Sequence, residues 1–338
     1  MAYPSYKKDK ENFSNHNFDI LIKIKIKAIR VHFNEYLRSC REDAHLTQEQ
    51  LVQHLYNYDI EHFEGLDTTT LSKWERGIVK PKLSRQVRII KYFQLLTGSA
   101  LPCLESHSIH HVEELICKAG MKNLLGKSKE LILNFPDKMI GADDLKVIQL
   151  RNTEAIDKII EINMELDRGF NHKFTQLLPE HFKAWALHPS NSFFVCNYKE
   201  HFFGLLFTLR LKPDTFEKII ALEIREKDLR EEDFASFEET GSDYIISFFA
   251  MNTKAATMLF IRYYAHLIAN QKVIANIGVA TMLDDARKLL ANMNLKKFHT
   301  QQLDNGLLLQ TYRQSLPDFL ASEYTVKMIL SHQECPEE

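Results

Sequence analysis

The segment between residues 46 and 81 constrains the fold most, because it holds two helix starts and one helix end within a short span. Its sequence is LTQEQLVQHLYNYDIEHFEGLDTTTLSKWERGIVKP. Thr47 can cap the first helix, and Gln50 stands three residues later, as a capping box requires. Asp67 can accept from the first free N–H groups of a second helix, and Gly77 suits a left-handed C-terminal cap. We therefore predict two short, closely joined helices within an all-α region.

The residues around these two helices resemble the Cro/C1-type (XRE) helix-turn-helix family of phage repressors. The likeness runs from about Ile26 to Leu96 and includes LRSCREDAHLTQEQL, SKWERG and KPKLSRQVRIIKYF. It implies a DNA-binding domain over residues 20–96, whose second helix enters the major groove of double-stranded DNA. The chain departs from the family at YNYDIEHFEGLD, which stands where the family has a short turn.

The resemblance also implies which side chains contact DNA. Gln48 matches the residue that holds a phosphate from the start of a helix. Thr68, Thr69 and Lys73 match the residues that contact base edges, with Ser72 beside them. Thr hydroxyl and methyl groups suit base edges and the thymine methyl group. The alternative interpretation of these threonines and the serine is ordinary surface polarity at a helix start.

Arg76, Lys80 and Lys82 fall where the family contacts the DNA backbone beyond the second helix. Arg41 and Glu75 match a buried ion pair that joins two helices of the family. Seven Lys or Arg and one acid lie between residues 71 and 96, which gives a local charge of +6, whereas the whole chain carries −2. Such segregation of positive charge favours phosphate binding. A solvated helix face is the alternative.

Composition indicates a soluble globular protein of about two domains, with 338 residues, 45% hydrophobic and 26% charged. No apolar run reaches the roughly 18 residues that a membrane span needs, and the polar N-terminus is not typical of a secretory signal. The five cysteines are dispersed and form no CxxC pattern. We therefore expect a cytoplasmic protein without a disulfide framework, a zinc site or a bound cofactor.

After a Gly-, Pro- and Ser-containing linker, the second half of the chain alternates between strand and helix patterns. The order β-α-α-β-β-β-β-α-β-α-β-β over residues 145–316 predicts a mixed α/β domain. In this prediction FEKIIALEI is a strand, and Glu223 lies on it. The predicted organisation is a flexible arm (1–19), a DNA-binding domain (20–96), a helical linker (97–144), the α/β domain (145–316) and a C-terminal tail (317–338).

Element order and the fragments HFKAWALHPSNSFFV and VIANIGVATMLDDARKLLANMNLKKF resemble the Gcn5-related N-acetyltransferase (GNAT) family. The family binds the pyrophosphate of acetyl-CoA on a glycine-rich loop at a helix N-terminus. The matching residues here, Asn252–Thr257, contain no glycine. The family often has a tyrosine that acts as a general acid. The corresponding residue here is Leu290, which cannot donate a proton. Asn294 replaces a family glycine. We therefore expect a degenerate domain that transfers no acetyl group and binds CoA weakly at best.

The resulting hypothesis is a sequence-specific DNA-binding transcriptional regulator that is not an enzyme. Its multidomain fold would join an all-α helix-turn-helix domain to a GNAT-like α/β domain that senses a ligand or dimerises. A homodimer on double-stranded DNA is expected, because one such domain contacts only a half-site. The C-terminal domain could also bind a small molecule or a protein. The alternatives are an active N-acetyltransferase with a DNA-targeting domain and an antitoxin-like or phage-control interaction protein.

Overall fold

The computed structural model describes residues 32–105, 107–126, 131–133, 135, 144–151, 153–169, 179–199, 201–304 and 306–330. The predicted arm over residues 1–19 lies outside them, as does the start of the predicted DNA-binding domain. Within the described part of the chain, none of the helices combines the length and apolar character that crossing a bilayer requires.

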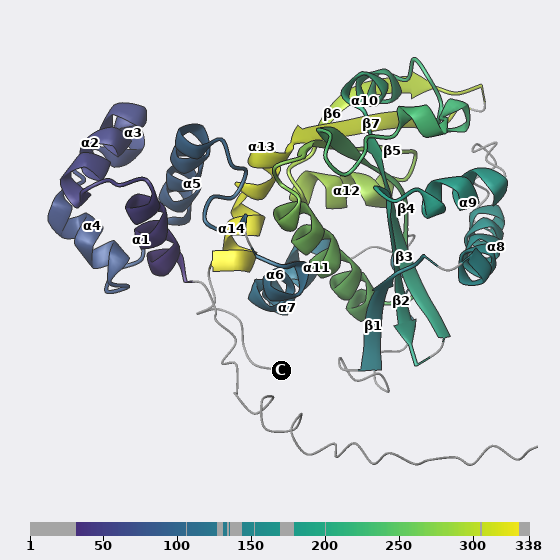
Figure 1. Cartoon of the computed structure of the whole chain (residues 1–338), viewed down its shortest axis with the longest axis horizontal. Coiled ribbons are helices and arrows are strands. Elements are labelled where there is room, and N and C mark those ends of the chain that lie inside the picture. The colour runs from purple at the N-terminus through teal and green to yellow at the C-terminus, as the bar shows by residue number, and fades with distance from the viewer. Residues whose placement is uncertain are drawn as a thin grey trace, which may run out of the picture.

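Five helices form the N-terminal group, shown on the left of Figure 1. They are α1 (Phe33–Asp43), α2 (Gln48–Tyr58), α3 (Ile60–Phe63), α4 (Thr68–Glu75) and α5 (Leu83–Thr97). The capping box at Thr47 is confirmed, since its hydroxyl accepts from the Gln50 N–H at 3.1 Å and Gln50 Oε1 accepts from the Thr47 N–H at 2.8 Å. Asp67 Oδ1 caps α4 by accepting from the Thr70 N–H at 2.6 Å. Gly77 follows α4 with a φ of +70°.

Among the described residues, the rest of the molecule is built around a seven-stranded sheet, with strand order β1-β2-β3-β4-β5-β7-β6. Its strands are β1 (Leu145–Gln149), β2 (Ser192–Tyr198), β3 (His201–Leu211), β4 (Gly241–Ala250), β5 (Ile274–Thr281), β6 (Lys296–Gln302) and β7 (Leu308–Ser315). All neighbouring pairs are antiparallel except β4 and β5, which run parallel. Strands β2 and β3 form one hairpin, and β6 and β7 form another.

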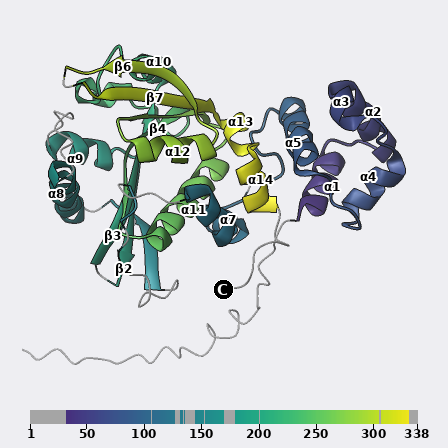
Figure 2. The same ribbon diagram turned by 180° about the vertical axis from the view of Figure 1, so that it is seen from behind.

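Helices cover both faces of this sheet. On one face lie α6 (Ile109–Leu115), α7 (Lys118–Leu125), α11 (Thr253–Ala269), α12 (Asp284–Asn292) and α14 (Glu323–Leu330). On the other lie α8 (Thr153–Gly169), α9 (Pro179–Leu187) and α10 (Pro213–Ile220). Figure 2 shows α7 and α11 together on the first face. Helix α11 is the centre of that layer, and nearly all its side chains are buried.

Two expectations from the sequence need comment. The segment FEKIIALEI was predicted as a strand, which is wrong, because Pro213 starts helix α10 there and Phe216, Ile219 and Ile220 share its buried face. Residues 317–330 of the predicted tail lie in α14 and in α13 (Leu316–Leu320). These two helices stand between the N-terminal helices and the sheet (Figure 1).

Contacts of α5 and of the loop after it connect the N-terminal helices to the rest of the structure. Lys91 Nζ donates to Asp318 Oδ1 at 2.7 Å, and Gln94 Nε2 donates to the Pro317 carbonyl oxygen at 2.8 Å. Farther along, Gln271 exchanges two hydrogen bonds with the backbone of Leu101. One continuous apolar cluster runs from α1 through α5 to α11 and α14. The mixed α/β domain is compatible with a GNAT-like fold.

Candidate functional site

The parallel strands β4 and β5 separate before either of them ends. Their pairing runs from Gly241 and Ile274 to Ile245 and Val279. Beyond that point β4 continues to Ala250, while β5 stays with β7 and pairs as far as Thr281. The backbone pairing therefore opens between the second half of β4 and the end of β5. We call this region the β4–β5 opening.

A bulge in β4 marks the start of the opening. Phe207 of β3 is opposite Ser247, whereas the next residue, Thr208, is opposite Ile245, so Ile246 is extra in the ladder. An extra residue bends its strand and raises the local twist. The bend therefore coincides with the place where β4 leaves β5.

A short segment closes the far end of the opening. Leu131–Leu133 runs parallel to β4 and forms a bridge at Ala250. The Ala250 N–H donates to the Leu131 carbonyl at 3.0 Å, and the Leu133 N–H donates to the Ala250 carbonyl at 2.9 Å. The Phe135 N–H donates to the Met251 carbonyl at 3.0 Å. Among the described residues, this side of β4 therefore pairs with β5 as far as Ile245 and with Ile132 at Ala250.

Helix α11 begins directly after β4, at the end of the opening. Asn252 caps it, and its Oδ1 accepts from the Ala255 N–H at 2.8 Å. The first turn of a helix presents backbone N–H groups and a positive dipole end, which attract anions. The Asn252 side chain is buried, and its Nδ2 has no hydrogen-bond partner in the described structure.

The first turn of α11 contains no glycine, and two of its alanines pack in the core. Ala255 and Ala256 are fully buried in the apolar core, so their methyl groups serve helix packing. Thr253 and Lys254 are half-buried, and they stand at the start of the helix. The glycine-free turn thus serves helix packing, and the expectation of weak CoA binding stays a prediction.

A tyrosine and a carboxylate meet where the strands part. Tyr244 of β4 is paired with Gly278 of β5, one position before the last pair. Its hydroxyl donates to Glu226 Oε1 at 2.6 Å. Burial, followed by the charge of Glu226, raises the pKa of Tyr244 well above its usual value, while a hydrogen bond from the Ala280 backbone opposes this. Tyr244 is therefore a neutral phenol at neutral pH.

Sequence analysis did not single out this pair. Glu226 belongs to the acidic stretch that follows α10, where the sequence does not distinguish single acids from one another. In the structure Glu223 is exposed in the turn after α10. Leu290 is buried on α12, where it packs in the core and has no proton to donate. Asn294 follows α12 with a φ of 62° and donates to the Asp318 carbonyl.

The residues predicted to contact DNA gather around α4 and the loop after it. Seven of them lie on this element or between it and α5: Thr68, Thr69, Ser72, Lys73, Arg76, Lys80 and Lys82. All seven are exposed except Ser72, which is half-buried. Gln48 differs, because its Nε2 donates to Glu75 Oε2 at 2.7 Å inside the structure. The predicted ion pair is confirmed, with 2.6 Å between Arg41 Nε and Glu75 Oε1.

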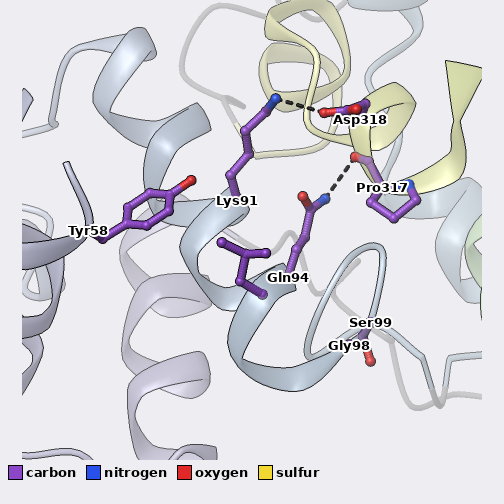
Figure 3. A pocket seen from close by; sticks show the side chains of 8 residues that line it. Tyr58, Lys91, Gln94, Gly98, Ser99, Pro317 and Asp318 are labelled. Carbon is purple, nitrogen blue, oxygen red and sulfur yellow. Dashed lines mark hydrogen bonds and ion pairs between the residues drawn. The ribbon is translucent and has the colours of Figure 1, made fainter.

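A separate pocket lies at the joint between α5 and α13, and Figure 3 shows it from close by. Its cavity volume is about 300 Å³. The lining residues are Tyr58, Lys91, Gln94, Leu95, Gly98, Ser99, Pro317 and Asp318. Lys91 and Gln94 use their donors to hold α13 (Figure 3). The pocket thus belongs to the joint, and its lining includes no residue of β4 or β5.

Comparison with family models gives no match, and no curated protein matches the chain. Among solved structures, similarity is found to FeeM, an N-acyl amino acid synthase from uncultured soil microbes, with 13% identity and a TM-score of 0.36. This match covers 52% of the present chain and 92% of FeeM. The C-terminal condensation domain of Ebony, in complex with beta-alanyl-dopamine, matches at 12% identity with a TM-score of 0.32. It covers 51% of this chain and 98% of that domain.

These comparisons correct the main hypothesis from the sequence. The two structures named above are an N-acyl amino acid synthase and a condensation domain, and they contradict the prediction of a DNA-binding transcriptional regulator without enzymatic activity. At these values of identity and TM-score, no residue role passes from those proteins to this chain. Any function has to rest on the geometry of the chain itself.

Proposed function

We propose that this chain is an N-acyltransferase, which moves an acyl group from a thioester to an amine. The observation that carries the proposal is the β4–β5 opening, which leads directly into the N-terminus of α11. Strand edges that leave the ladder offer backbone N–H and C=O groups, and such groups pair with an extended chain that contains amides. A helix N-terminus at the end of that edge favours a negative charge.

The geometry fits a donor with a thioester on an extended amide-containing arm that ends in phosphate. The arm would lie beside β4 between Ile245, where pairing with β5 ends, and Ala250, where Ile132 forms its bridge. Its phosphates would lie near Thr253 and Lys254 at the start of α11. Acyl-CoA has this chemistry, and so does an acyl group on a phosphopantetheine arm.

In the reaction, the amine nitrogen attacks the thioester carbonyl carbon, the C–S bond breaks, and the sulfur leaves as a thiolate. The attacking nitrogen must lose a proton to a base. We assign this base to Glu226, whose carboxylate accepts a hydrogen bond from Tyr244 at the start of the opening. Tyr244 orients the carboxylate, and its own proton stays in place because of its raised pKa. Leu290 cannot protonate the leaving thiolate, so solvent or the acceptor supplies that proton.

The test is an acyl-transfer assay with purified full-length protein. Acetyl-CoA and longer acyl-CoA donors are offered with amino acids and aromatic amines, thiol release is followed, and the product is identified by mass spectrometry. We expect an N-acylated amine. Glu226→Gln should lower the rate by roughly 10²–10⁴-fold without weakening donor binding. Glu223→Gln, a nearby exposed carboxylate, is the matched control.

Two outcomes would count against the proposal. One is a Glu226→Gln variant as active as the control, which would remove the assigned base. The other is a folded wild-type protein that neither binds any acyl thioester in calorimetry nor releases a thiol. The second result would leave the β4–β5 opening without a chemical role.

A DNA-targeting role of the N-terminal helices stays a second proposal. Its support is the shared position of the exposed Thr69, Lys73, Arg76, Lys80 and Lys82 on α4 and the following loop. Glu75, the acid within this basic segment, is buried and paired with Arg41, so it does not cancel the surface charge. The acyltransferase would then act near DNA, and DNA binding would not by itself make the chain a regulator.

The test of this second proposal is DNA binding by fluorescence anisotropy at several salt concentrations. Changing Lys80 and Lys82 together to Ala should weaken binding and lower the salt slope by about two units. Thr69→Ala should instead alter sequence preference. If the double variant binds DNA as the wild type does, this face makes no DNA contact.

A further inference from the structure

Two cysteines that are far apart in the sequence meet at the joint between the N-terminal helices and the sheet. Cys40 lies on α1, and Cys103 lies in the loop after α5. Their sulfur atoms are 2.8 Å apart, with no covalent bond between them. A disulfide requires a sulfur separation of about 2.05 Å, so a small movement would bring the pair to bonding distance.

The surroundings give the two thiols different access. Cys40 is buried with 2% exposure, whereas Cys103 is half-buried and can be reached from solvent. Cys103 adopts a φ of 68°, a conformation that residues other than glycine rarely take. Asp43 Oδ2 accepts from its thiol at 3.4 Å. The loop therefore holds an accessible thiol in contact with a buried one.

The same loop is anchored to the α/β domain. Gln271, which follows α11, accepts from the Leu101 N–H at 2.5 Å and donates to the Leu101 carbonyl at 3.2 Å. On the other side, Gln94 of α5 donates to the Ala100 carbonyl at 2.5 Å. The loop thus connects the helical group with the sheet, and Cys103 stands two residues beyond Leu101.

We infer that Cys40 and Cys103 form a reversible redox site, which a low-molecular-weight disulfide such as oxidised glutathione converts to an intramolecular disulfide. In the oxidised state α1 is tied covalently to the loop that Gln271 holds against the α/β domain. The helical group then cannot separate from the sheet at this point. The inference is independent of the proposed acyl transfer.

The reaction proceeds in two exchanges. The thiolate of Cys103 attacks one sulfur of the small disulfide, a mixed disulfide forms, and one small thiolate leaves. The thiolate of Cys40 then attacks the Cys103 sulfur, and the second small thiolate leaves. The two cysteines are oxidised, the small disulfide is reduced to two thiols, and these take up the two protons released. Burial, followed by the neighbouring Cys103, raises the pKa of Cys40, and the Tyr36 hydroxyl opposes this, so the second exchange gains speed with rising pH.

The experiment treats full-length protein with oxidised glutathione, blocks remaining thiols by alkylation under denaturing conditions, and maps the peptides by mass spectrometry. We expect a peptide pair linked through Cys40 and Cys103 and absent after reduction. Cys196, which is buried and free, should be alkylated in full. Cys117 is disulfide-bonded, contrary to the expectation from cysteine spacing. Reduction breaks that bond as well, so the control is Cys103→Ser, which keeps the Cys117 disulfide and cannot form the proposed one.

A second measurement keeps the inference testable if a variant folds poorly. Hydrogen exchange of α1 and of the loop over Leu101–Leu104 should slow on oxidation in the wild type and stay unchanged in Cys103→Ser. The inference is overturned if folded wild-type protein yields only a glutathione adduct on Cys103, or no modification at all. It is equally overturned if the linked peptide forms while exchange in α1 and the loop does not change.

Discussion

The helical group and the sheet each hold an arginine beside a buried carboxylate, and the two pairs are held very differently. In the helical group, Arg41 donates to both oxygens of Glu75, and Gln48 adds a third donor. In the sheet, Arg210 of β3 lies opposite Asp243 of β4, but its Nη2 donates to the carbonyls of Glu239 and Val273.

The difference appears in the titration of the two arginines. The hydrogen bond to Glu75 raises the pKa of Arg41, whereas burial lowers the pKa of Arg210 despite the opposing effect of Asp243. Asp243 Oδ2 has no hydrogen-bond partner in the described structure, and His266 Nε2 lies 3.5 Å from it. Glu75 accepts from three donors, so replacing it should cost much of the stability of the helical group. Asp243 is held mainly by more distant charge, so replacing it should cost less stability.

The largest expected effect therefore comes from Glu75. Glu75→Gln removes a buried charge and leaves the half-buried Arg41 without it, so it should lower the free energy of unfolding of the helical group by roughly 3–5 kcal/mol. Urea unfolding followed by the fluorescence of Trp74, in a Trp185→Phe background, measures this. The control is Glu42→Gln, which also removes a contact to Arg41 but at an exposed residue. Overlapping curves for Glu75→Gln and the control would remove the comparison.

A smaller loss is expected at Asp243. Asp243→Asn should lower the free energy of unfolding by about 2 kcal/mol, because Arg210 keeps its two carbonyl acceptors and the new amide can donate within the same space. Trp185 fluorescence in a Trp74→Phe background follows the α/β domain. If Asp243→Asn lowers the free energy of unfolding by more than Glu75→Gln does, Asp243 contributes more stability than Glu75, and the expected order is wrong.

The smallest effect is expected at the joint. A hydrogen bond from Lys91 lowers the pKa of Asp318, so the pair contributes stability above the unfolded pKa of about 4, and this contribution is lost as pH falls through the lower folded value. Both side chains are at least a third exposed, so Asp318→Asn should cost less than about 1 kcal/mol. Melting temperatures of wild type and variant should converge below about pH 4. A difference that persists there would point to packing rather than charge.

Sequence reasoning worked where a local rule acts on neighbouring residues. The caps at Thr47, Asp67 and Gly77 depend on residues within one turn, and the structure has all three. It failed for FEKIIALEI, because a short apolar run fits a strand and a helix face equally, and the start at Pro213 decides between them. Helix α14 was missed for a related reason, since its apolar face is short and its partners are α5 and α7.

The candidate site was beyond local rules altogether. The β4–β5 opening depends on where two strands stop pairing, and the Tyr244–Glu226 contact joins residues from separate elements. A motif-based reading gave weight to missing glycines and could not see that Ala255 and Ala256 point into the core. The Arg41–Glu75 pair was found only because a family resemblance supplied the partner, since the residues lie 34 positions apart.

The position of α13 and α14 has a consequence for the order in which the chain is made. Helix α5 ends at Thr97, and α14, against which it packs, ends at Leu330. Roughly 230 residues must be added between them, which takes roughly 10–50 s at common rates of synthesis. During that time the helical group can fold on the ribosome while its docking partner does not yet exist. The side of α5 that packs on α13 and α14 is then open to chaperones and to other nascent chains.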